Sequence, residues 1–523
     1  MSGQEKKHGA VAAGHPDTAR AALTMLQEGG NAFDAVMAAM AAACVAEPVL
    51  CSLGGGGFLL ARPAGEIPRL LDFFVQTPKQ PIDPDYADFM PILCDFGVTQ
   101  QEFHVGRAST ATPGCIKGLF EVASSLGRVP VKSIVEPALH LAREGICLNR
   151  LQAYIFDVVG PIYMITEGSR KIFESREQPD QLVREGETMV NFDFADFLEV
   201  LAIEGEDLFY RGEVSALIDT ECRGSGGALS RADLESYELI TRSPLKINYG
   251  DVKLFTNPPP SVGGILIAFA LQLYEYVKKS EWQFGDADQL GTLVRVMELT
   301  NEARVESGLN EDISDLVNEM LLDGEFLARY REQTLAHPKA YRGTTHISVI
   351  DVDGNAAALT LSNGEGSGHV LPVTGMMLNN MLGEEDLNPK GFHAWPTDTR
   401  MSSMMAPTMI IEPSGRLTAL GSGGSNRIRT AILQVLLNLL DFSMGLSDAV
   451  EAPRAHFEQG LLSLESGFEE AVIAALKNSW PEFKAWDERN LFFGGVHVVR
   501  SDSTTGELVG AGDPRRGGVA LNV

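Results

Sequence analysis

The sequence predicts one large α/β domain, and three observations support this fold class. The chain has 523 residues, of which 44% are hydrophobic and 21% charged, so it is long enough to bury a large core. Helical hydrophobic spacing dominates from about Pro130 to Tyr330, whereas alternating apolar residues with Asp-Gly and Asn-Gly turns dominate from Tyr341 to about Leu420. No repeat, low-complexity tract or Ser/Gly linker separates these regions, which favours one domain over several modules.

The composition argues against several classes of partner. Lys and Arg number 42 against 70 Asp and Glu, a formal net charge of −28 that repels nucleic acids and anionic membrane surfaces. The most apolar stretch, Ala32 to Leu50, is interrupted by charged residues and a proline, and no apolar segment follows the lysines near the N-terminus. We therefore expect a soluble, cytoplasmic protein with no nucleic-acid partner and no membrane partner.

Six cysteines lie in the first half of the chain, without a CxxC pair. This spacing favours buried free thiols in a reducing compartment over a disulfide framework or a zinc site. The cysteines are Cys44, Cys51, Cys94, Cys115, Cys147 and Cys222.

The first elements are predicted to be two helices and a strand. Ala19 to Gln27 has helical spacing, and Asn31 can cap a second helix that Pro48 ends. This second helix is too apolar for the surface, so we expect it to be buried. A run of four glycines, Gly54 to Gly57, precedes a strand at Leu59 to Arg62 but lacks the Gly-Lys-Ser/Thr of a phosphate loop. Close backbone packing beside a pocket is the expected role of these glycines.

A β-hairpin is predicted in the second half of the chain. Apolar and polar residues alternate from Thr344 as far as an Asp353-Gly354 turn. A two-residue loop would place Thr345 opposite Ser362 and Thr344 opposite Asn363, with Cβ atoms about 4.5–5.5 Å apart. A helix from Ile428 to Leu440 and strands from Ala485 onward complete the predicted elements.

Seven short motifs follow one another along the chain. They are Leu53-Gly54-Gly55-Gly56-Gly57-Phe58, Pro113-Gly114, Pro258-Pro259-Pro260-Ser261-Val262-Gly263-Gly264, Thr344-Thr345-His346, Leu378-Asn379-Asn380, Ser422-Gly423-Gly424-Ser425-Asn426-Arg427 and Ala452-Pro453-Arg454. Together they resemble the γ-glutamyltranspeptidase (glutathione hydrolase) family of N-terminal nucleophile hydrolases. The motifs occur in the family's order, and the resemblance covers the chain from about Gly9 to Arg515.

The resemblance implies a four-layer αββα sandwich with Thr344 at the end of a central strand. It also implies that a precursor cuts itself between Gly343 and Thr344. Segments 1–343 and 344–523 would then remain associated as a heterodimer within one globular domain, and a dimer of that heterodimer is left open. No cofactor and no metal ion are expected.

The chemistry of such a site is an acyl transfer through Thr344. A threonine hydroxyl is a weak nucleophile until a base takes its proton, and the freed α-amine, with an unperturbed pKa of about 7.7–8.0, can serve as that base. Alignment to the family assigns the two oxyanion N–H donors to Gly424 and Ser425, where the family usually has two glycines. Ser362 is a further catalytic candidate because the predicted hairpin brings its hydroxyl close to Thr344.

The predicted substrate pocket departs from the family. Phe74 stands where the family has an Arg that binds the substrate carboxylate, and Met381 stands where it has a Gln. Glu384 can still pair with an ammonium group. The other predicted substrate-binding residues are Asn363, Glu365 and Ser403. Any of Arg107, Arg400 and Arg427 could replace the missing clamp from another direction.

We therefore predict a self-processing amidohydrolase or acyltransferase that cleaves γ-glutamyl or related small-molecule amides through an acyl-Thr344 intermediate. Two alternatives remain: an acylase for non-glutamyl amides, and a catalytically silent relative that acts as a binding protein. No Gly-x-Ser-x-Gly elbow anchors a serine hydrolase triad, and His346 fits packing or hydrogen bonding better than metal binding.

Overall fold

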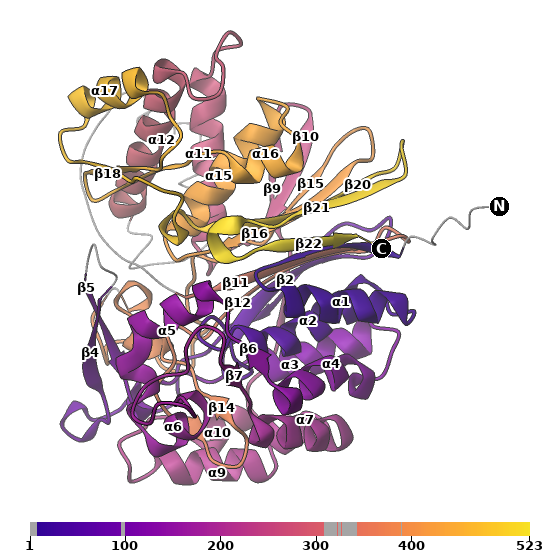
Figure 1. Ribbon diagram of the computed structural model, residues 1–523, viewed down its shortest axis with the longest axis vertical. Helices are drawn as coiled ribbons and strands as arrows, with labels where there is room; N and C mark the ends of the chain where they lie inside the picture. Colours follow the sequence, from indigo (N-terminus) through magenta and orange to yellow (C-terminus); the bar gives the residue numbers. More distant parts are fainter. Residues whose placement is uncertain are drawn as a thin grey trace.

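Two β-sheets packed face to face, with helices on both outer faces, form the centre of the molecule (Figure 1). The computed structural model describes residues 8–95, 100–307, 322, 326, 343–388 and 390–522. Strand β11 (Thr345–Asp351) of one sheet packs on β16 (Leu417–Gly423) and β20 (Gly495–Asp502) of the other. The predicted αββα sandwich is therefore confirmed.

The first sheet contains seven strands among the described residues, each antiparallel to its neighbours, in the order β22-β1-β11-β12-β2-β3-β8. Besides β11, this sheet comprises β1 (Gly9–Ala13), β2 (Gly56–Arg62), β3 (Arg69–Phe73), β8 (Ile240–Arg242), β12 (Ala356–Ser362) and β22 (Val519–Asn522). β11 lies inside this sheet, so both of its edges are hydrogen-bonded.

The second sheet, again counted over the described residues, has six antiparallel strands in the order β21-β20-β16-β15-β10-β9. In addition to β16 and β20 it comprises β9 (Leu245–Tyr249), β10 (Val252–Thr256), β15 (Thr408–Ile411) and β21 (Glu507–Ala511). Strands from both halves of the chain contribute to each sheet.

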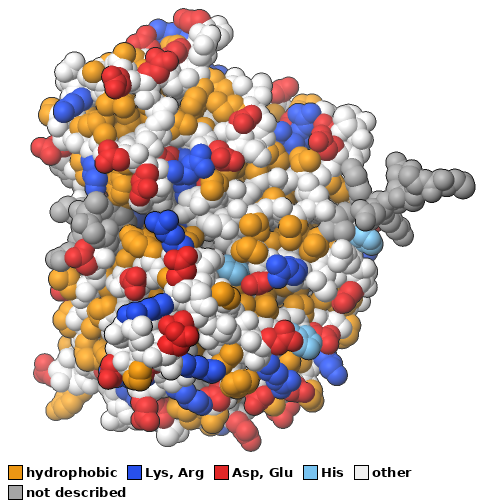
Figure 2. All heavy atoms as spheres, viewed as in Figure 1, with side chains coloured by type: hydrophobic (Ala, Val, Ile, Leu, Met, Phe, Trp, Pro, Cys, Tyr) orange, Lys and Arg blue, Asp and Glu red, His pale blue; other side chains and the backbone are white. Residues whose placement is uncertain are grey.

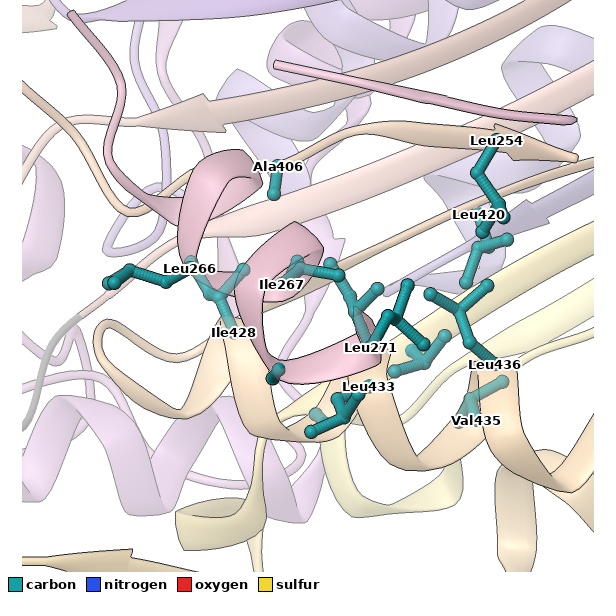
Figure 3. Close-up of a cluster of buried hydrophobic side chains, with 14 of the residues drawn as sticks. Leu254, Leu266, Ile267, Leu271, Ala406, Leu420, Ile428, Leu433, Val435 and Leu436 are labelled. Atoms are coloured by element: carbon teal, nitrogen blue, oxygen red, sulfur yellow. The ribbon is translucent and has the colours of Figure 1, made fainter. Parts of the chain in front are cut away.

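Helices cover the two outer faces of the sandwich. On the first sheet lie α1 (Pro16–Gln27) and α2 (Ala32–Ala46), with α4 (Val131–Glu144) and α7 (Phe192–Glu204) outside them. On the second sheet lie α11 (Gly263–Val277), α15 (Arg427–Leu440) and α16 (Leu446–Glu451), with α12 (Ala287–Glu306) packed on α11. Leu266 and Ile267 of α11 and Leu433 of α15 meet beneath this sheet in the core shown in Figure 3.

Shorter elements surround the sandwich. The remaining helices are α3 (Cys115–Ser125), α5 (Arg150–Tyr163), α6 (Glu167–Phe173), α8 (Asp207–Tyr210), α9 (Glu213–Cys222), α10 (Arg231–Glu235) and α17 (Glu470–Ser479). The remaining strands are β4 (Met90–Asp95), β5 (Gln100–Val105), β6 (Ile146–Cys147), β7 (Thr188–Met189), β13 (Val370–Leu371), β14 (Met376–Met377), β17 (Ala455–Glu458), β18 (Leu461–Leu464) and β19 (Phe483–Ala485). Single 3₁₀ turns are η1 (Pro84–Tyr86), η2 (Arg107–Ser109), η3 (Met381–Gly383), η4 (Glu385–Leu387), η5 (Leu491–Phe493) and η6 (Pro514–Arg516). The region predicted to be helix-rich, from about Pro130 to Tyr330, contains the short strands β6 to β10 as well as helices. Most of its residues beyond 307 lie outside the described residues.

The buried helix α2 begins as its sequence predicts. The Asn31 side chain accepts hydrogen bonds from the N–H groups of Phe33 (2.8 Å) and Asp34 (3.0 Å), and the Asp34 carboxylate accepts one from Asn31 N–H (2.9 Å). This reciprocal capping box pairs N–H groups that the first turn of a helix leaves without partners. α2 can therefore pass through the core with nearly every side chain buried.

The predicted register of the β11–β12 hairpin is wrong by one residue. The structure pairs Thr345 with Leu361, and the first strand ends at Asp351 rather than Val352. The Asp351 carboxylate accepts hydrogen bonds from the Asn355 backbone N–H (2.9 Å) and side-chain amide (2.8 Å). These contacts fix a three-residue loop, which shifts every pair along the hairpin.

The surface carries both signs of charge. On the face shown in Figure 2, acidic and basic side chains are interspersed, with small groups of hydrophobic side chains between them. Among the described helices, none combines the length and the apolar composition needed to cross a bilayer.

Asp351 provides a test of how the hairpin is fixed. Its buried carboxylate also accepts a hydrogen bond from Ala32 N–H (2.9 Å) at the start of α2. Asp351→Ala should lower the free energy of unfolding by about 3 kcal/mol, because buried N–H groups lose a charged acceptor. Urea denaturation followed by circular dichroism measures this change.

Asp353→Ala, in the same loop, is the matched control. Asp353 and its ion-pair partner Arg128 are each about half exposed, so the expected loss is below about 0.5 kcal/mol. Equal losses for the two variants would contradict this account of the loop.

Candidate active site

The predicted nucleophile lies directly before strand β11. Thr344 is buried, and its Oγ1 donates a hydrogen bond to the carbonyl oxygen of Gly343 at 2.6 Å. Ser362 Oγ, at the end of β12, donates to the same carbonyl oxygen at 2.9 Å. The structure therefore brings together the predicted nucleophile, the predicted cleavage bond and the predicted catalytic serine, although through the corrected register.

The two adjacent threonines differ in their contacts. Thr345 Oγ1 donates to the carboxylate of Glu47 at 2.9 Å, and Thr18 Oγ1 donates to the other oxygen of that carboxylate at 2.8 Å. Burial raises the pKa of Glu47, while the charge of His15 and these hydroxyl groups oppose the rise. The hydroxyl of Thr345 is thus engaged in a buried network, whereas that of Thr344 faces the predicted scissile carbonyl.

The predicted oxyanion turn joins β16 to α15 and lies beside the nucleophile. Gly424 (φ +121°) and Ser425 (φ +54°) both have left-handed backbone conformations. Within the described part of the chain, neither N–H has a hydrogen-bond acceptor. A side chain at the preceding Gly423 would lie 2.0 Å from the carbonyl oxygen of Thr344, so only glycine permits this close approach.

Arg516 also lies at the candidate site, although no motif in the sequence indicated it. Its Nη1 donates to the carbonyl oxygen of Thr344 at 3.3 Å, and its Nη2 would lie 3.0 Å from a side chain at Gly424. Burial, followed by the charge of Arg427, lowers the pKa of Arg516 to about 10, and the carboxylates of Glu365 and Glu47 oppose this effect. A buried guanidinium therefore lies close to both the predicted nucleophile and the predicted oxyanion turn.

A cavity of about 440 Å³ opens in front of Thr344. Five of the predicted site residues besides the cleavage pair line it: Phe74, Ser362, Glu384, Ser403 and Ser425. Much of the remaining lining is apolar: Pro260, Val262, Met381, Leu387, Trp395, Met401, Met404, Met405 and Ile428. Arg304 and Lys390, which the sequence did not single out, also line this cavity together with Arg400.

Two of the three arginines proposed as substitute clamps lie outside the cavity lining. Arg107 pairs with Asp88 (3.1 Å) and Glu221 (3.5 Å), and the guanidinium of Arg427 lies over the ring of Phe492.

Arg400 does line the cavity, but its guanidinium is already hydrogen-bonded to acceptors of the protein itself. Nη1 donates to Asp72 Oδ1 (3.1 Å), the Phe74 carbonyl (2.8 Å) and Tyr237 Oη (2.8 Å), and Nη2 donates to the Glu238 carbonyl (2.6 Å). Phe74 itself is buried and stacks on Phe58 with ring centroids 5.3 Å apart.

The remaining predicted binding residues have different surroundings. Ser403 Oγ accepts a hydrogen bond from Met405 N–H at 3.1 Å, so its side chain is tied to its own loop. Asn363 is fully buried, and its side-chain amide has no hydrogen-bond partner among the described residues. Its amide oxygen would lie 3.1 Å from a side chain at Gly55, which confirms the close packing predicted for the glycine run.

His346 lies between the two sheets. Its ring nitrogens hydrogen-bond to Thr360 Oγ1 (2.8 Å) and Ser348 Oγ (2.9 Å). Burial lowers the pKa of His346 well below its usual value, so the ring stays neutral at physiological pH. Within the described residues, no cluster of His, Cys, Asp and Glu side chains has the arrangement of a metal site.

Comparison with known proteins identifies the family. The family model for gamma-glutamyltranspeptidase matches residues 18–523. Among curated relatives, the glutathione hydrolase proenzyme of Escherichia coli (strain K12) is 28% identical over 97% of this chain and 90% of its own length. The acylase ACY 1 proenzyme of Pseudomonas sp. (strain SE83) is 29% identical over 90% of this chain and 86% of its own length.

Solved structures show the same fold. Cephalosporin acylase from Bacillus halodurans superposes with a TM-score of 0.85 at 23% identity, over 100% of this chain and 97% of that one. Gamma-glutamyltranspeptidase from Helicobacter pylori gives a TM-score of 0.53 at 23% identity, over 61% of this chain and 90% of that one. The chain therefore belongs to the gamma-glutamyltranspeptidase family and has the N-terminal nucleophile hydrolase fold of these enzymes.

Proposed function

We propose that this chain cuts itself at the Gly343–Thr344 bond and then cleaves amide bonds through an acyl-Thr344 intermediate. The main support is the hydrogen bond from Thr344 Oγ1 to the Gly343 carbonyl oxygen at 2.6 Å. Gly423, which directly precedes Gly424 and Ser425, packs against the carbonyl of Thr344, and Ser425 lines the same cavity as Gly343 and Thr344. In the cut enzyme the Thr344 α-amine takes the hydroxyl proton as Oγ1 attacks the substrate carbonyl. The N–H groups of Gly424 and Ser425 stabilise the developing oxyanion, and the amine returns the proton to the leaving group.

The sheets explain how the two segments would stay together after cleavage. β11 of segment 344–523 is hydrogen-bonded to β1, and β12 to β2, both of segment 1–343. In the second sheet, β15 pairs with β10 across the same division. This shared hydrogen bonding supports a heterodimer. The cytoplasmic location expected from the sequence stays a prediction.

We propose further that the acyl group of the substrate is largely apolar. The motif resemblance places Phe74 and Met381 where the family has polar residues. In the structure both line the cavity, together with other methionines and Trp395. A free carboxylate against these side chains would lose water without gaining a charged partner. Simple γ-glutamyl amides should therefore bind weakly.

Dicarboxylic monoamides are a second candidate class of substrate. Lys390 lines the same cavity, and its ammonium group can attract a carboxylate at the far end of an acyl chain. The remaining alternative is a γ-glutamyl hydrolase in which Arg400 binds the substrate carboxylate in place of the family arginine.

Thr344→Ala should abolish self-cleavage, because no hydroxyl remains to attack the Gly343 carbonyl. A denaturing gel and intact mass spectrometry should show one full-length chain, against two segments for the wild type. Thr344→Ser keeps a hydroxyl and should still yield two segments. Two chains in the alanine variant would contradict the assigned nucleophile, and an uncut wild type would favour the catalytically silent alternative.

The acyl preference is tested by steady-state kinetics on three p-nitroanilides: γ-glutamyl, glutaryl and phenylacetyl. We expect kcat/KM of the wild type to be lowest for the γ-glutamyl compound. Phe74→Arg should raise kcat/KM for γ-glutamyl-p-nitroanilide by about tenfold or more, since a charge-assisted contact contributes about 1.5–3 kcal/mol.

Phe74→Leu, which keeps the site apolar, is the control and should leave γ-glutamyl hydrolysis poor. The proposal fails if the wild type prefers the γ-glutamyl compound. A preference for the glutaryl compound would identify the dicarboxylic class.

A further inference from the structure

A tight turn after β12 directs one carboxylate toward the predicted cleavage bond. Glu365 lies between Gly364 (φ +64°) and Gly366 (φ +86°), and both glycines have left-handed conformations that other residues rarely adopt. Asn380 Oδ1 accepts a hydrogen bond from Glu365 N–H at 2.9 Å. A side chain at Gly364 would lie 2.1 Å from that amide oxygen. The turn is therefore held in one conformation, and the side chain of Glu365 is 3% exposed.

The carboxylate of Glu365 contacts the residue whose bond is to be cut. Its Oε1 accepts a hydrogen bond from Gly343 N–H at 2.6 Å. The carbonyl oxygen of the same glycine accepts hydrogen bonds from Thr344 Oγ1 and Ser362 Oγ. Gly343 is thus held at both of its polar backbone atoms, from opposite ends of the residue.

The charge of Glu365 has a buried counterpart. Glu365 and Arg516 interact electrostatically, and Arg516 in turn donates to the carbonyl oxygen of Thr344. A charged acceptor makes a stronger hydrogen bond than a neutral one, and low solvent access strengthens it further. The contact to Gly343 N–H is therefore suited to restrain the junction.

We propose that Glu365 is a positioning residue for self-cleavage, which holds Gly343 so that its carbonyl carbon stays within reach of Thr344 Oγ1. This inference rests on the proposed cleavage site. In the step itself, Oγ1 forms a bond to the Gly343 carbonyl carbon, the Gly343–Thr344 C–N bond breaks, and the hydroxyl proton ends on the Thr344 nitrogen. Water then hydrolyses the ester, which leaves a Gly343 carboxylate and a free Thr344 hydroxyl. Glu365 is not consumed.

The test follows the conversion of newly made precursor. Each variant is synthesised in a cell-free system with a short pulse of labelled methionine, and the two segments are followed on a denaturing gel during the chase. Glu365→Ala should slow cleavage by about tenfold or more, because reaction rates depend steeply on the alignment of the reacting atoms. Glu365→Gln should cleave more slowly than the wild type but clearly faster than Glu365→Ala, since its amide oxygen can still accept from Gly343 N–H but without the charge. Glu385→Ala, which removes an exposed carboxylate nearby in the sequence, should not change the rate.

The effect of Glu365 on folding is measured in variants that cannot cleave themselves. Thr344→Ala and the double variant Thr344→Ala/Glu365→Ala have the same covalent state, and we expect their Tm values to agree within a few degrees. Cleavage of Glu365→Ala at the wild-type rate would overturn the inference and leave the cleavage site standing. A glutamine variant as slow as the alanine variant would also overturn it, since the acceptor alone would then be insufficient. If the wild type is never cut, it is the proposed cleavage that fails.

Discussion

The hydrogen bonding of β11 along both edges is the constraint on which the site depends. β1 and β12 fix this strand within the first sheet, and β16 packs across it from the second. Thr344 therefore emerges from a rigid element, at the point where the ends of the two sheets meet. Gly423 makes that meeting possible because a side chain there would collide with the carbonyl oxygen of Thr344. The predicted nucleophile and the predicted oxyanion turn are thus positioned by backbone packing.

The acyl pocket is built differently from the reacting centre. Its walls are side chains on loops and helix ends, so they can change without moving Thr344 or Gly424. In this chain Phe74 continues the aromatic packing of Phe58, and Arg400 is bound to protein acceptors beneath it. Under the proposed mechanism, substitution in the pocket can therefore alter the acyl group that is accepted while the chemistry at Thr344 is retained. Relatives named as glutathione hydrolase and as acylase fit this division.

Much of the fold could be predicted from the sequence because local signals were strong. The cap at Asn31, the apolar run of α2 and the glycine run all behave as their residue types suggest. The hairpin register could not be predicted, because a two-residue loop was assumed and the Asp351 carboxylate instead stabilises three loop residues. That contact depends on a buried position which the pattern of alternation does not reveal.

Residues of the candidate site could be predicted from the sequence in two cases only. Either they lie near Thr344 along the chain, or they belong to a motif of the family. Arg516 is 172 residues from Thr344 along the chain and becomes its neighbour only through the pairing of β22 with β1 and the turn before β22. The sequence run Asp513-Pro514-Arg515-Arg516 gave no signal of this contact, because arginines are mostly exposed and such a run fits a surface turn. Glu365 was predicted as a substrate ligand, whereas its contact in the structure is with Gly343.

Acylation of Thr344 as the N-terminal residue of the smaller segment can be observed during turnover. Turnover of phenylacetyl-p-nitroanilide is quenched with acid within milliseconds, and the protein is then analysed by intact mass and by peptide mapping. We expect the smaller segment to begin at Thr344 and to carry one phenylacetyl group on that residue. Acylation of any other residue, or a segment that begins elsewhere, would contradict this expectation.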